Sequence, residues 1–583
     1  MDARLTVTWK IGGEAGYGII SSGTMLARTC ARLGYHIFVT NEYPSLIRGG
    51  HNIVTVKVSS AKFHALDEDL HILVALNKET LDLHKDELLP GAVVVFDPKD
   101  SDGLELTSRD IALCPVPLFE ITKSHSGEPV MRNTVALGAT VAFLGLSFDV
   151  LSGVIKDQFE HKGEEVIAHN QEIARAGYDY VVMTYPSVAF AKLSSVSKTE
   201  DKLIINGSEV FGVAAVRAGL KFAAIYPMTP INALISFLAD HAKSLGIVYK
   251  QPEDEIAGIN MALGASLAGV RSMVATSGGG FALMTEGISL AGMLELPVVV
   301  DLGMRVGPAT GMPTWTEQGE LQFAIHSGHG EFAKIVLAPG NAEQIYSTVI
   351  EAFHLADAFQ VPVIVLTDKY MNESQWCVPK SAFAGDVVID RGKMVRAEDL
   401  GKEVFKRYDL SVSDGVSPRS VPGMKGGQYF ANSYEHDEFG YVTEESAVRE
   451  KMAQKRLLKL GSIQKIVRPP EVYGDPKAEI ALTCFGSTVG AVLDALEEAK
   501  YVINGKSAKL LHFTWMSPFP SDAVTHLLTG IKTIVDIEQN GTSQLASLIR
   551  EYTGIQCTHK VQRFSGRPFT PKFVLEALKK NLQ

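Results

Sequence analysis

Two side chains in the middle of the chain could bind a carboxylate. Thr229 lies in the segment Tyr226-Pro227-Met228-Thr229-Pro230, whose two prolines restrict the backbone on either side of its hydroxyl. Arg305 follows the apolar run 298–302, and a guanidinium matches a carboxylate with two parallel hydrogen bonds that lysine cannot make. The alternatives are a proline-rich turn that starts a helix, and a surface arginine in a salt bridge. For each residue taken alone, the alternative is the simpler explanation.

A carboxylate, Glu255, precedes a run of small and apolar residues, 256–264, which is typical of a closely packed helix. The helix dipole favours an acidic residue in the first turn, and this explains Glu255 without catalysis. The second interpretation is a buried carboxylate that supports proton transfer. The neighbouring Glu253 and Asp254 are better explained as solvated capping charges.

Two glycine-rich segments each lie between a predicted strand and a predicted helix. In Thr276-Ser277-Gly278-Gly279-Gly280-Phe281 the glycines would let a ligand approach the backbone closely, although a plain tight turn explains them too. The segment Gly12-Gly13-Glu14-Ala15-Gly16-Tyr17-Gly18 could cradle a pyrophosphate. It lacks the third glycine of the dinucleotide fingerprint, so NAD binding is only weakly indicated.

The elements that must position these residues alternate between short β-branched runs and helical patterns. This alternation predicts an α/β fold with several doubly wound parallel-sheet domains. At 583 residues the chain is too long for a single core. Composition shifts predict a first domain, a central domain, an insertion or connection, and a last domain, over residues 1–190, 191–384, 385–474 and 475–583. The polar segment 192–202 is the predicted linker.

The insertion is rich in Gly, Ser, Pro and charged residues, with a basic helix predicted at 448–459. It carries Glu435-His436-Asp437-Glu438, which resembles a metal-binding cluster. Its spacing fits no zinc motif, so we predict a solvated polar loop.

Composition excludes several classes of function. A net charge of −11 argues against general nucleic-acid binding. Five scattered cysteines, none in a C-x-x-C pair, match neither a disulfide framework nor an iron–sulfur ligand set. The longest uncharged run, 133–148, is too short to span a membrane, and no signal peptide is apparent. We therefore expect a cytoplasmic protein with no membrane partner.

Taken together, the central motifs resemble the α subunit of the 2-oxoacid:ferredoxin oxidoreductases. The match rests on the Tyr226–Pro230 loop, Glu255 before its small-residue helix, Ser277-Gly278, and Arg-x-Gly-Pro-x-Thr-Gly-x-Pro-Thr from Arg305 to Thr314, continuing into Glu317-Gln318-Gly319. The resemblance implies that Thr229 and Arg305 hold a 2-oxo acid, and that Glu255 meets the pyrimidine ring of thiamine diphosphate. It further implies that Tyr226, Pro227, Ser277 and Gly278 line the cofactor site.

The flanking domains extend the resemblance over nearly the whole chain. The first looks like the γ domain of the family, through its glycine loop and Arg48-Gly49-Gly50-His51-Asn52. The family often has Gly-Gln where this chain has Glu14-Ala15. The resemblance implies a lid over the active site, with Gly13, Gly16 and Arg48 as candidate contacts for coenzyme A. Arg48 could bind a phosphate or could simply fix its own loop, and the sequence favours neither. The last domain, with Glu538-Gln539-Asn540-Gly541, looks like the transketolase C-terminal-type domain, which in the family mainly supports subunit contacts.

Half of a thiamine site is absent from the sequence. No Gly-Asp-Gly segment is present to hold Mg²⁺ and the diphosphate, and there is no cysteine cluster. The resemblance therefore implies a β subunit with the diphosphate site, Mg²⁺ and a [4Fe–4S] cluster, in an (αβ)₂ assembly that shares the thiamine diphosphate. The implied reaction is the reversible, CoA-dependent oxidative decarboxylation of a 2-oxo acid, foremost 2-oxoglutarate to succinyl-CoA, with electrons passed to ferredoxin.

Other functions remain open from the sequence. Pyruvate or a branched-chain 2-oxo acid could be the substrate. A transketolase- or dehydrogenase-type thiamine enzyme would work without ferredoxin. A non-catalytic CoA- or nucleotide-binding protein would use the first glycine loop alone.

Overall fold

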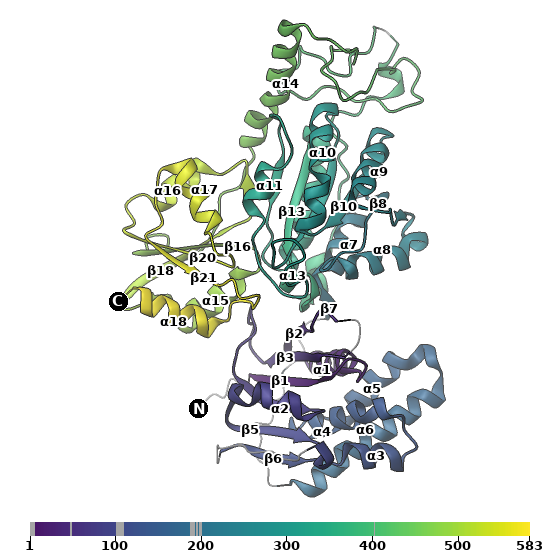
Figure 1. Ribbon diagram of the computed structural model, residues 1–583, viewed down its shortest axis with the longest axis vertical. Helices are drawn as coiled ribbons and strands as arrows, with labels where there is room; N and C mark the ends of the chain where they lie inside the picture. Colours follow the sequence, from purple (N-terminus) through teal and green to yellow (C-terminus); the bar gives the residue numbers. More distant parts are fainter. Residues whose placement is uncertain are drawn as a thin grey trace. The chain divides into compact units, whose positions relative to one another are not determined.

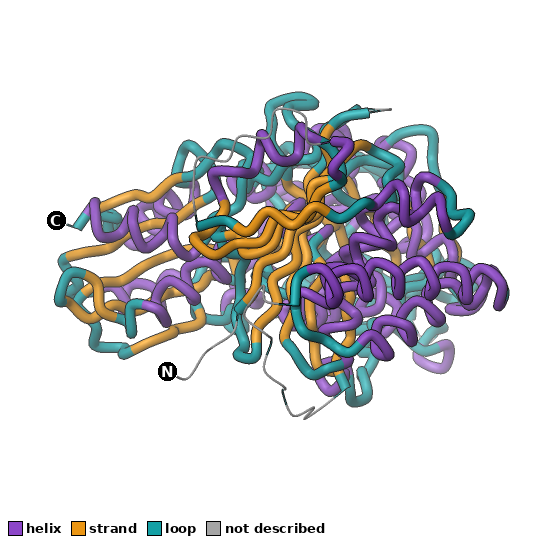
Figure 2. Tube along the Cα trace, turned by 90° about the horizontal axis from the view of Figure 1, so that it is seen from below, coloured by secondary structure: helices purple, strands orange, loops and turns teal. Residues whose placement is uncertain are grey.

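The computed structural model describes residues 6–46, 49–100, 110–186, 193, 196, 201–401 and 403–582 (Figure 1). It divides into two compact units. The first holds 1–205, 374–382 and 570–572, and the second holds the rest. Both combine sheets with helices, as the orange strands and purple helices of Figure 2 show, which confirms the α/β class. The predicted linker, 192–202, lies mostly outside the described residues, which include only 193, 196, 201 and 202 of it.

The first unit is built on one eight-stranded sheet. Its order is β6 (Ala112–Pro115), β5 (Leu88–Phe96), β4 (Leu70–Ala75), β1 (Val7–Glu14), β3 (His51–Ser59), β2 (His36–Glu42), β14 (Gln375–Pro379) and β7 (Lys202–Asn206). The sheet is mixed: β1 pairs parallel to β4 but antiparallel to β3, and β2 also pairs antiparallel to β3. The short connection between β2 and β3 explains their antiparallel pairing, because parallel neighbours need a longer crossover.

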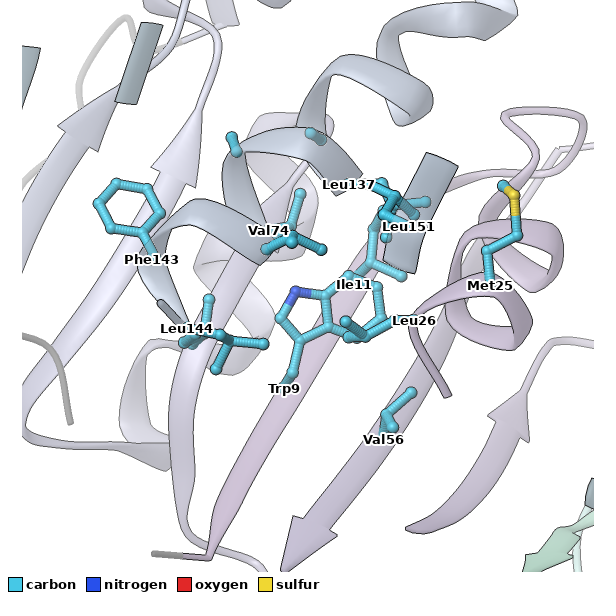
Figure 3. Close-up of a cluster of buried hydrophobic side chains, with 14 of the residues drawn as sticks. Trp9, Ile11, Met25, Leu26, Val56, Val74, Leu137, Phe143, Leu144 and Leu151 are labelled. Atoms are coloured by element: carbon cyan, nitrogen blue, oxygen red, sulfur yellow. The ribbon is translucent and has the colours of Figure 1, made fainter. Parts of the chain in front are cut away.

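Helices supply the other half of that unit's core. They are α1 (Ile19–Arg32), α2 (Lys78–His84), α3 (Leu118–Ser124), α4 (Arg132–Phe143), α5 (Phe148–Phe159) and α6 (Glu164–Thr184). Alternate residues of β1, Trp9 and Ile11, point into one cluster with Leu26 and Leu137 (Figure 3). The Trp9 indole donates to Thr140 Oγ1 at 3.1 Å, so its buried N–H is satisfied.

The second unit contains a seven-stranded sheet. Its order is β19 (Trp515–Ser517), β12 (Ile335–Leu337), β13 (Pro362–Asp368), β11 (Val298–Met304), β10 (Ser272–Thr276), β8 (Phe222–Ala224) and β9 (Val248–Lys250). All neighbours are parallel except β12 and β19. Its helices are α7 (Gly207–Arg217), α8 (Asn232–Leu245), α9 (Glu255–Leu267), α10 (Gly278–Leu294), α11 (Leu321–His326), α12 (Ala342–Phe359) and α13 (Lys369–Glu373).

A smaller sheet in the same unit is formed by the C-terminal residues. Its order is β15 (Glu471–Gly474), β18 (Lys506–Phe513), β16 (Ile480–Phe485), β20 (Thr533–Glu538) and β21 (His559–Gln562), with β17 (Val502–Ile503) paired to β18. The associated helices are α15 (Thr488–Glu498), α16 (Ser521–Leu528), α17 (Gln544–Thr553) and α18 (Pro571–Asn581). Core side chains of both sheets, among them Val300 and Phe513, belong to one apolar cluster.

Helix α14 (Ser446–Gln464) anchors the insertion through buried charges. Lys455 and Lys459 each place Nζ 2.7 Å from the carboxylate of Glu295, at the end of α10. Arg407 adds a hydrogen bond to the Glu295 carbonyl at 2.8 Å. All four side chains are almost fully buried, so two lysines pair with one carboxylate while Arg407 binds the adjacent backbone. The two lysines and Arg407 hold the pKa of Glu295 well below its usual range, against its desolvation.

The prediction that residues 435–438 form a solvated loop is wrong. His436 is fully buried and packs on Tyr408, with the ring centroids 4.1 Å apart. Glu435 forms a two-bond ion pair with Arg456, at 2.7 and 3.0 Å. The acidic and imidazole groups thus hold the insertion against α14. No described helix combines the length and apolar character that a bilayer span requires.

Candidate active site

Three loops meet where adjacent parallel strands end. β8, β10 and β11 are neighbours in the sheet, and their carboxyl ends lead into residues 225–231, Ser277 and the loop from Arg305 to Glu320. Ligands of open α/β sheets bind outside this edge. The fold therefore brings together the three motifs that the sequence analysis singled out.

Arg305 and Thr229 contact each other directly. Arg305 Nη1 donates to the Thr229 carbonyl oxygen at 2.7 Å. Pro230 packs on β11, since a Cβ atom at Gly303 would lie 3.0 Å from its ring. Within the described residues, Arg305 has no carboxylate within 4.0 Å, and the Thr229 hydroxyl makes no hydrogen bond. The remaining guanidinium donors and the hydroxyl are thus available to a ligand.

Glu255 lies in the first turn of α9 and is only 3% exposed. Asp254, not Glu255, caps this helix, because its carboxylate accepts from the Ala257 N–H at 2.8 Å. Within the described residues, Glu255 Oε1 is buried without a hydrogen-bond partner. A buried acceptor left unpaired costs roughly 1–3 kcal/mol, so this oxygen is suited to a ligand donor.

The start of α10 separates two carboxyl groups. Ser277 is the N-cap residue and is fully buried, and its hydroxyl has no partner among the described residues. A Cβ atom at Gly280 would collide with the carboxyl of Glu255, and one at Gly278 would lie 2.6 Å from Glu320 Oε1. The glycines therefore make room for carboxyl groups as well as for a ligand. The positive end of the helix dipole faces the same space.

Tyr226 and Pro227 lie in the loop after β8. Tyr226 is half-buried and Pro227 is exposed. The loop is fixed beside β10 by a weak bond from Thr276 Oγ1 to Met228 Sδ, 3.8 Å long. Both residues are thus at the edge of the site, without a contact that specifies a role.

Glu320 is a residue of the site that the sequence analysis did not identify. It is half-buried, and its Oε2 atom has no hydrogen-bond partner among the described residues. Desolvation, followed by the nearby Glu317 carboxylate, raises the pKa of Glu320 to about 8, although Arg305 acts in the opposite direction. The sequence signal was its position directly after Glu317-Gln318-Gly319.

The C-terminal residues hold the loop that carries these groups. The Gln318 N–H donates to the Gln539 carbonyl at 2.8 Å, and Asn540 donates to the Gln318 carbonyl at 3.1 Å. Gln544 donates to the Gly319 carbonyl at 2.7 Å. The 538–541 motif thus supports the active-site loop within one chain, beyond the role in subunit contacts that the resemblance implied.

The side chain of Gln318 links the loop to both sheets. Its amide donates to Asp368 Oδ2 at 3.0 Å and accepts from Thr488 Oγ1 at 3.1 Å. Ser487 also donates to Asp368, at 2.6 Å. Gln318 and Asp368 are fully buried, so this network fixes the loop between Arg305 and Glu320.

The first unit has a separate cavity of about 510 Å³ at its glycine loop. Gly16 and the N-terminal residues of α1 line it, whereas Gly13 does not. Its charged lining residues among those described are Glu14 and Glu42. Arg48, the third predicted CoA contact, lies outside the described residues.

Three family models match consecutive parts of the chain. Residues 8–180 match "Pyruvate ferredoxin/flavodoxin oxidoreductase". Residues 213–455 match "Pyruvate flavodoxin/ferredoxin oxidoreductase, thiamine diP-bdg", and residues 478–574 match "Pyruvate:ferredoxin oxidoreductase core domain II". The central match contains the three loops of the site.

Full-length relatives agree with these matches. The chain is 32% identical to the 2-oxoacid:ferredoxin oxidoreductase subunit alpha of Saccharolobus solfataricus, over 99% of this chain and 98% of that one. It is 30% identical to the 2-oxoglutarate synthase subunit KorA of Archaeoglobus fulgidus, over 65% and 99%. It resembles the 2-oxoglutarate:ferredoxin oxidoreductase of Magnetococcus marinus, solved with 2-oxoglutarate, coenzyme A and succinyl-CoA bound, at 31% identity, full coverage of both chains and a TM-score of 0.92.

Proposed function

Because the chain belongs to the family of 2-oxoacid:ferredoxin oxidoreductase alpha subunits, we propose that its three loops bind the pyrimidine ring of thiamine diphosphate and the carboxylate of a 2-oxo acid. The single observation that carries this proposal is the buried Glu255 Oε1 atom, which has no hydrogen-bond partner among the described residues. Arg305, which has no carboxylate partner there, supports it. Both lie at the edge of the sheet where ligands bind.

Glu255 is the proposed partner of the pyrimidine N1′ atom. A protonated ring nitrogen or its tautomer can donate to the unpaired Oε1, and Gly280 leaves the approach open. When bound, thiamine diphosphate supplies the nucleophilic carbon for attack on a 2-oxo group. Glu255 accepts the hydrogen bond from the pyrimidine N1′ and so stabilises the protonated ring or tautomer that this chemistry needs. We propose that the pocket for the pyrimidine ring is lined by Ser277, Gly278, Tyr226 and Pro227.

Arg305 and Thr229 are the proposed anchors of the 2-oxo acid. The guanidinium binds the carboxylate that is lost as CO₂, and the Thr229 hydroxyl donates to the oxo group or the carboxylate. Fixing the carboxylate aligns its loss, which is a positioning and electrostatic contribution. We propose 2-oxoglutarate as the substrate, supported by the names of the KorA relatives and by the ligands of the Magnetococcus structure. Pyruvate and branched-chain 2-oxo acids are the alternatives.

The rest of the enzyme is proposed to come from a β subunit. The chain has no Gly-Asp-Gly segment for Mg²⁺ and no cysteine pair. We therefore assign the diphosphate, Mg²⁺ and a [4Fe–4S] cluster to that partner, in a cytoplasmic (αβ)₂ assembly that reduces ferredoxin. The relatives named as alpha subunits support a multi-subunit enzyme.

The cavity of the first unit is the proposed contact for coenzyme A. The N–H groups at the start of α1 attract negative charge, whereas Glu14 and Glu42 repel it. This balance favours the neutral pantetheine arm over the phosphates at the described part of the cavity. Gly16 belongs to the lining, and a contact from Arg48 stays a prediction.

The test is anaerobic reconstitution of the complex with its β subunit. We expect ferredoxin reduction that requires both CoA and one 2-oxo acid, with 2-oxoglutarate preferred in a screen against pyruvate and branched-chain acids. Glu255→Gln should lower kcat by about 100-fold or more if it supports general acid–base chemistry. The matched control is Glu253→Gln, two residues away. Equal turnover of the two variants would refute the role of Glu255, and lipoyl-dependent turnover without ferredoxin would refute the family reaction.

A further inference from the structure

Glu320 is a carboxyl group inside a site that must accept a substrate carboxylate. Its backbone is fixed from two sides, because Gln544 donates to the Gly319 carbonyl at 2.7 Å and accepts from the Gln322 N–H at 2.8 Å. Its side chain is held against Gly278 at the start of α10. The backbone of the loop is thus fixed at Glu320, and the carboxyl group lies against the first turn of α10.

Glu320 and Arg305 lie on the same loop, 305–320, without forming an ion pair. Arg305 and Glu320 influence each other electrostatically, yet within the described residues no carboxylate lies within 4.0 Å of the guanidinium. The one hydrogen bond of Arg305 goes to the Thr229 carbonyl. An ionised Glu320 would compete with an incoming carboxylate for Arg305 and would repel it. A neutral Glu320 would do neither.

Starting from the proposed 2-oxo acid site, we propose that Glu320 takes up a proton when Arg305 binds the substrate carboxylate, so that substrate affinity is coupled to the protonation of Glu320. The proton comes from solvent, and no other bond changes. Glu320 thereby acts as a positioning residue that keeps Arg305 available. It also gives the site a preference for substrate at neutral and acidic pH.

The groups around Glu320 favour this coupling. Burial, the unpaired Oε2 atom and the Glu317 carboxylate all disfavour the charged form. Arg305 and the N–H groups of Gly319 and Glu320 itself act in the opposite direction, and the net result is a pKa of about 8. The first turn of α10, 278–281, carries no titratable side chain, and Glu255 of α9 reaches the same helix at Gly280.

The test measures the KM for 2-oxo acid from pH 7 to 9.5 in the complete enzyme at saturating CoA and acceptor. In the wild type, KM should rise about tenfold per pH unit above the Glu320 pKa, with a smaller change in kcat. Glu320→Gln should remove this rise, and Glu320→Asp should keep it. Glu317→Gln is the matched control, and it should move the break to lower pH without changing the slope.

A second measurement does not depend on any variant. Glutarate carries the carboxylates without the reactive oxo group, and its binding can be followed by calorimetry in two buffers of different ionisation enthalpy. At pH 8.5 the wild-type complex should take up about 0.8 proton per site. No uptake, or the same KM profile in wild type and Glu320→Gln, would overturn the inference while leaving the proposed function intact. Absence of any 2-oxo acid turnover in the wild type would instead refute the function.

Discussion

Replacing Gln318 with methionine should weaken substrate binding without touching the ligand. The substitution keeps the volume of the side chain but removes its donor to Asp368 and its acceptor for Thr488, which lie at 3.0 and 3.1 Å. The backbone bonds from Gln539 and Asn540 remain. The variant therefore isolates the side-chain network that joins the active-site loop to both sheets.

The size of the effect follows from the burial of the partners. Asp368 and Thr488 are both almost fully buried, and each buried group that loses a partner costs about 1–3 kcal/mol. Ser487 still donates to Asp368, so the lower half of that range applies there. Together the two losses remove about 2–5 kcal/mol from the network that holds the 305–320 loop. Since each 1.4 kcal/mol is tenfold, we expect the KM for 2-oxo acid to rise at least tenfold.

The assay is steady-state ferredoxin reduction by the reconstituted complex, with KM and kcat determined separately. Gln322→Met is the matched control, because its side chain makes no hydrogen bond among the described residues and only its backbone N–H bonds to Gln544. A fall in kcat at constant KM, or equal kinetics of the two variants, would show that the network does not position Arg305 and Glu320.

Three further changes test other parts of the structure. Arg305→Lys keeps the charge but loses the planar fork, so kcat/KM for the 2-oxo acid should fall about 10- to 100-fold, and an unchanged value would reject the clamp. Glu295→Gln removes the carboxylate that pairs with two buried lysines and should cost about 3–5 kcal/mol of local stability. Lys459→Met should cost much less, because burial lowers the pKa of Lys459 to about 7 and Lys455 still pairs with Glu295. Hydrogen exchange of the α14 amides compares the two variants, and equal loss of protection would refute the asymmetry. Burial raises the pKa of Asp301 to about 7, so between pH 4 and 7 the unfolded chain binds fewer protons at this residue than the folded chain, and stability falls as pH rises. Asp301→Asn should abolish this fall and raise the free energy of unfolding at pH 7 by about 2–4 kcal/mol, measured by denaturant unfolding. An unchanged dependence of stability on pH would contradict the prediction.

The motifs of the site could be found in the sequence because each is contiguous. The Tyr226–Pro230 loop, Glu255 and the 305–314 string each combine residue types that only a particular chemistry needs together. The strand–helix alternation was sufficient for the α/β class and for most elements. The run 256–264, for example, was predicted as a closely packed helix and lies within α9. It did not reveal the antiparallel pairing of β1 with β3, because strand direction depends on the connection and not on the strand residues.

What the sequence could not show depends on contacts between distant residues. Lys455 and Lys459 look like the charged face of a basic helix, for which solvent is the usual setting. Their burial follows only from Glu295, 160 residues away from Lys455 in the chain. Likewise, Asn540 lies 222 residues after Gln318, so no local pattern indicates that the C-terminal motif holds the active-site loop.

The first turn of α10 explains why two acidic groups can have different tasks in one site. The carboxyl group of Glu255 lies near Gly280 and that of Glu320 lies near Gly278. Because these glycines are two positions apart in a helix, the two carboxyl groups lie on different sides of α10. The backbone of this turn therefore lies between the two carboxyl groups. One carboxylate can therefore face a ring nitrogen while the other changes its protonation with the substrate. An alanine at either glycine would displace one of these two groups, and the position of the alanine would decide which.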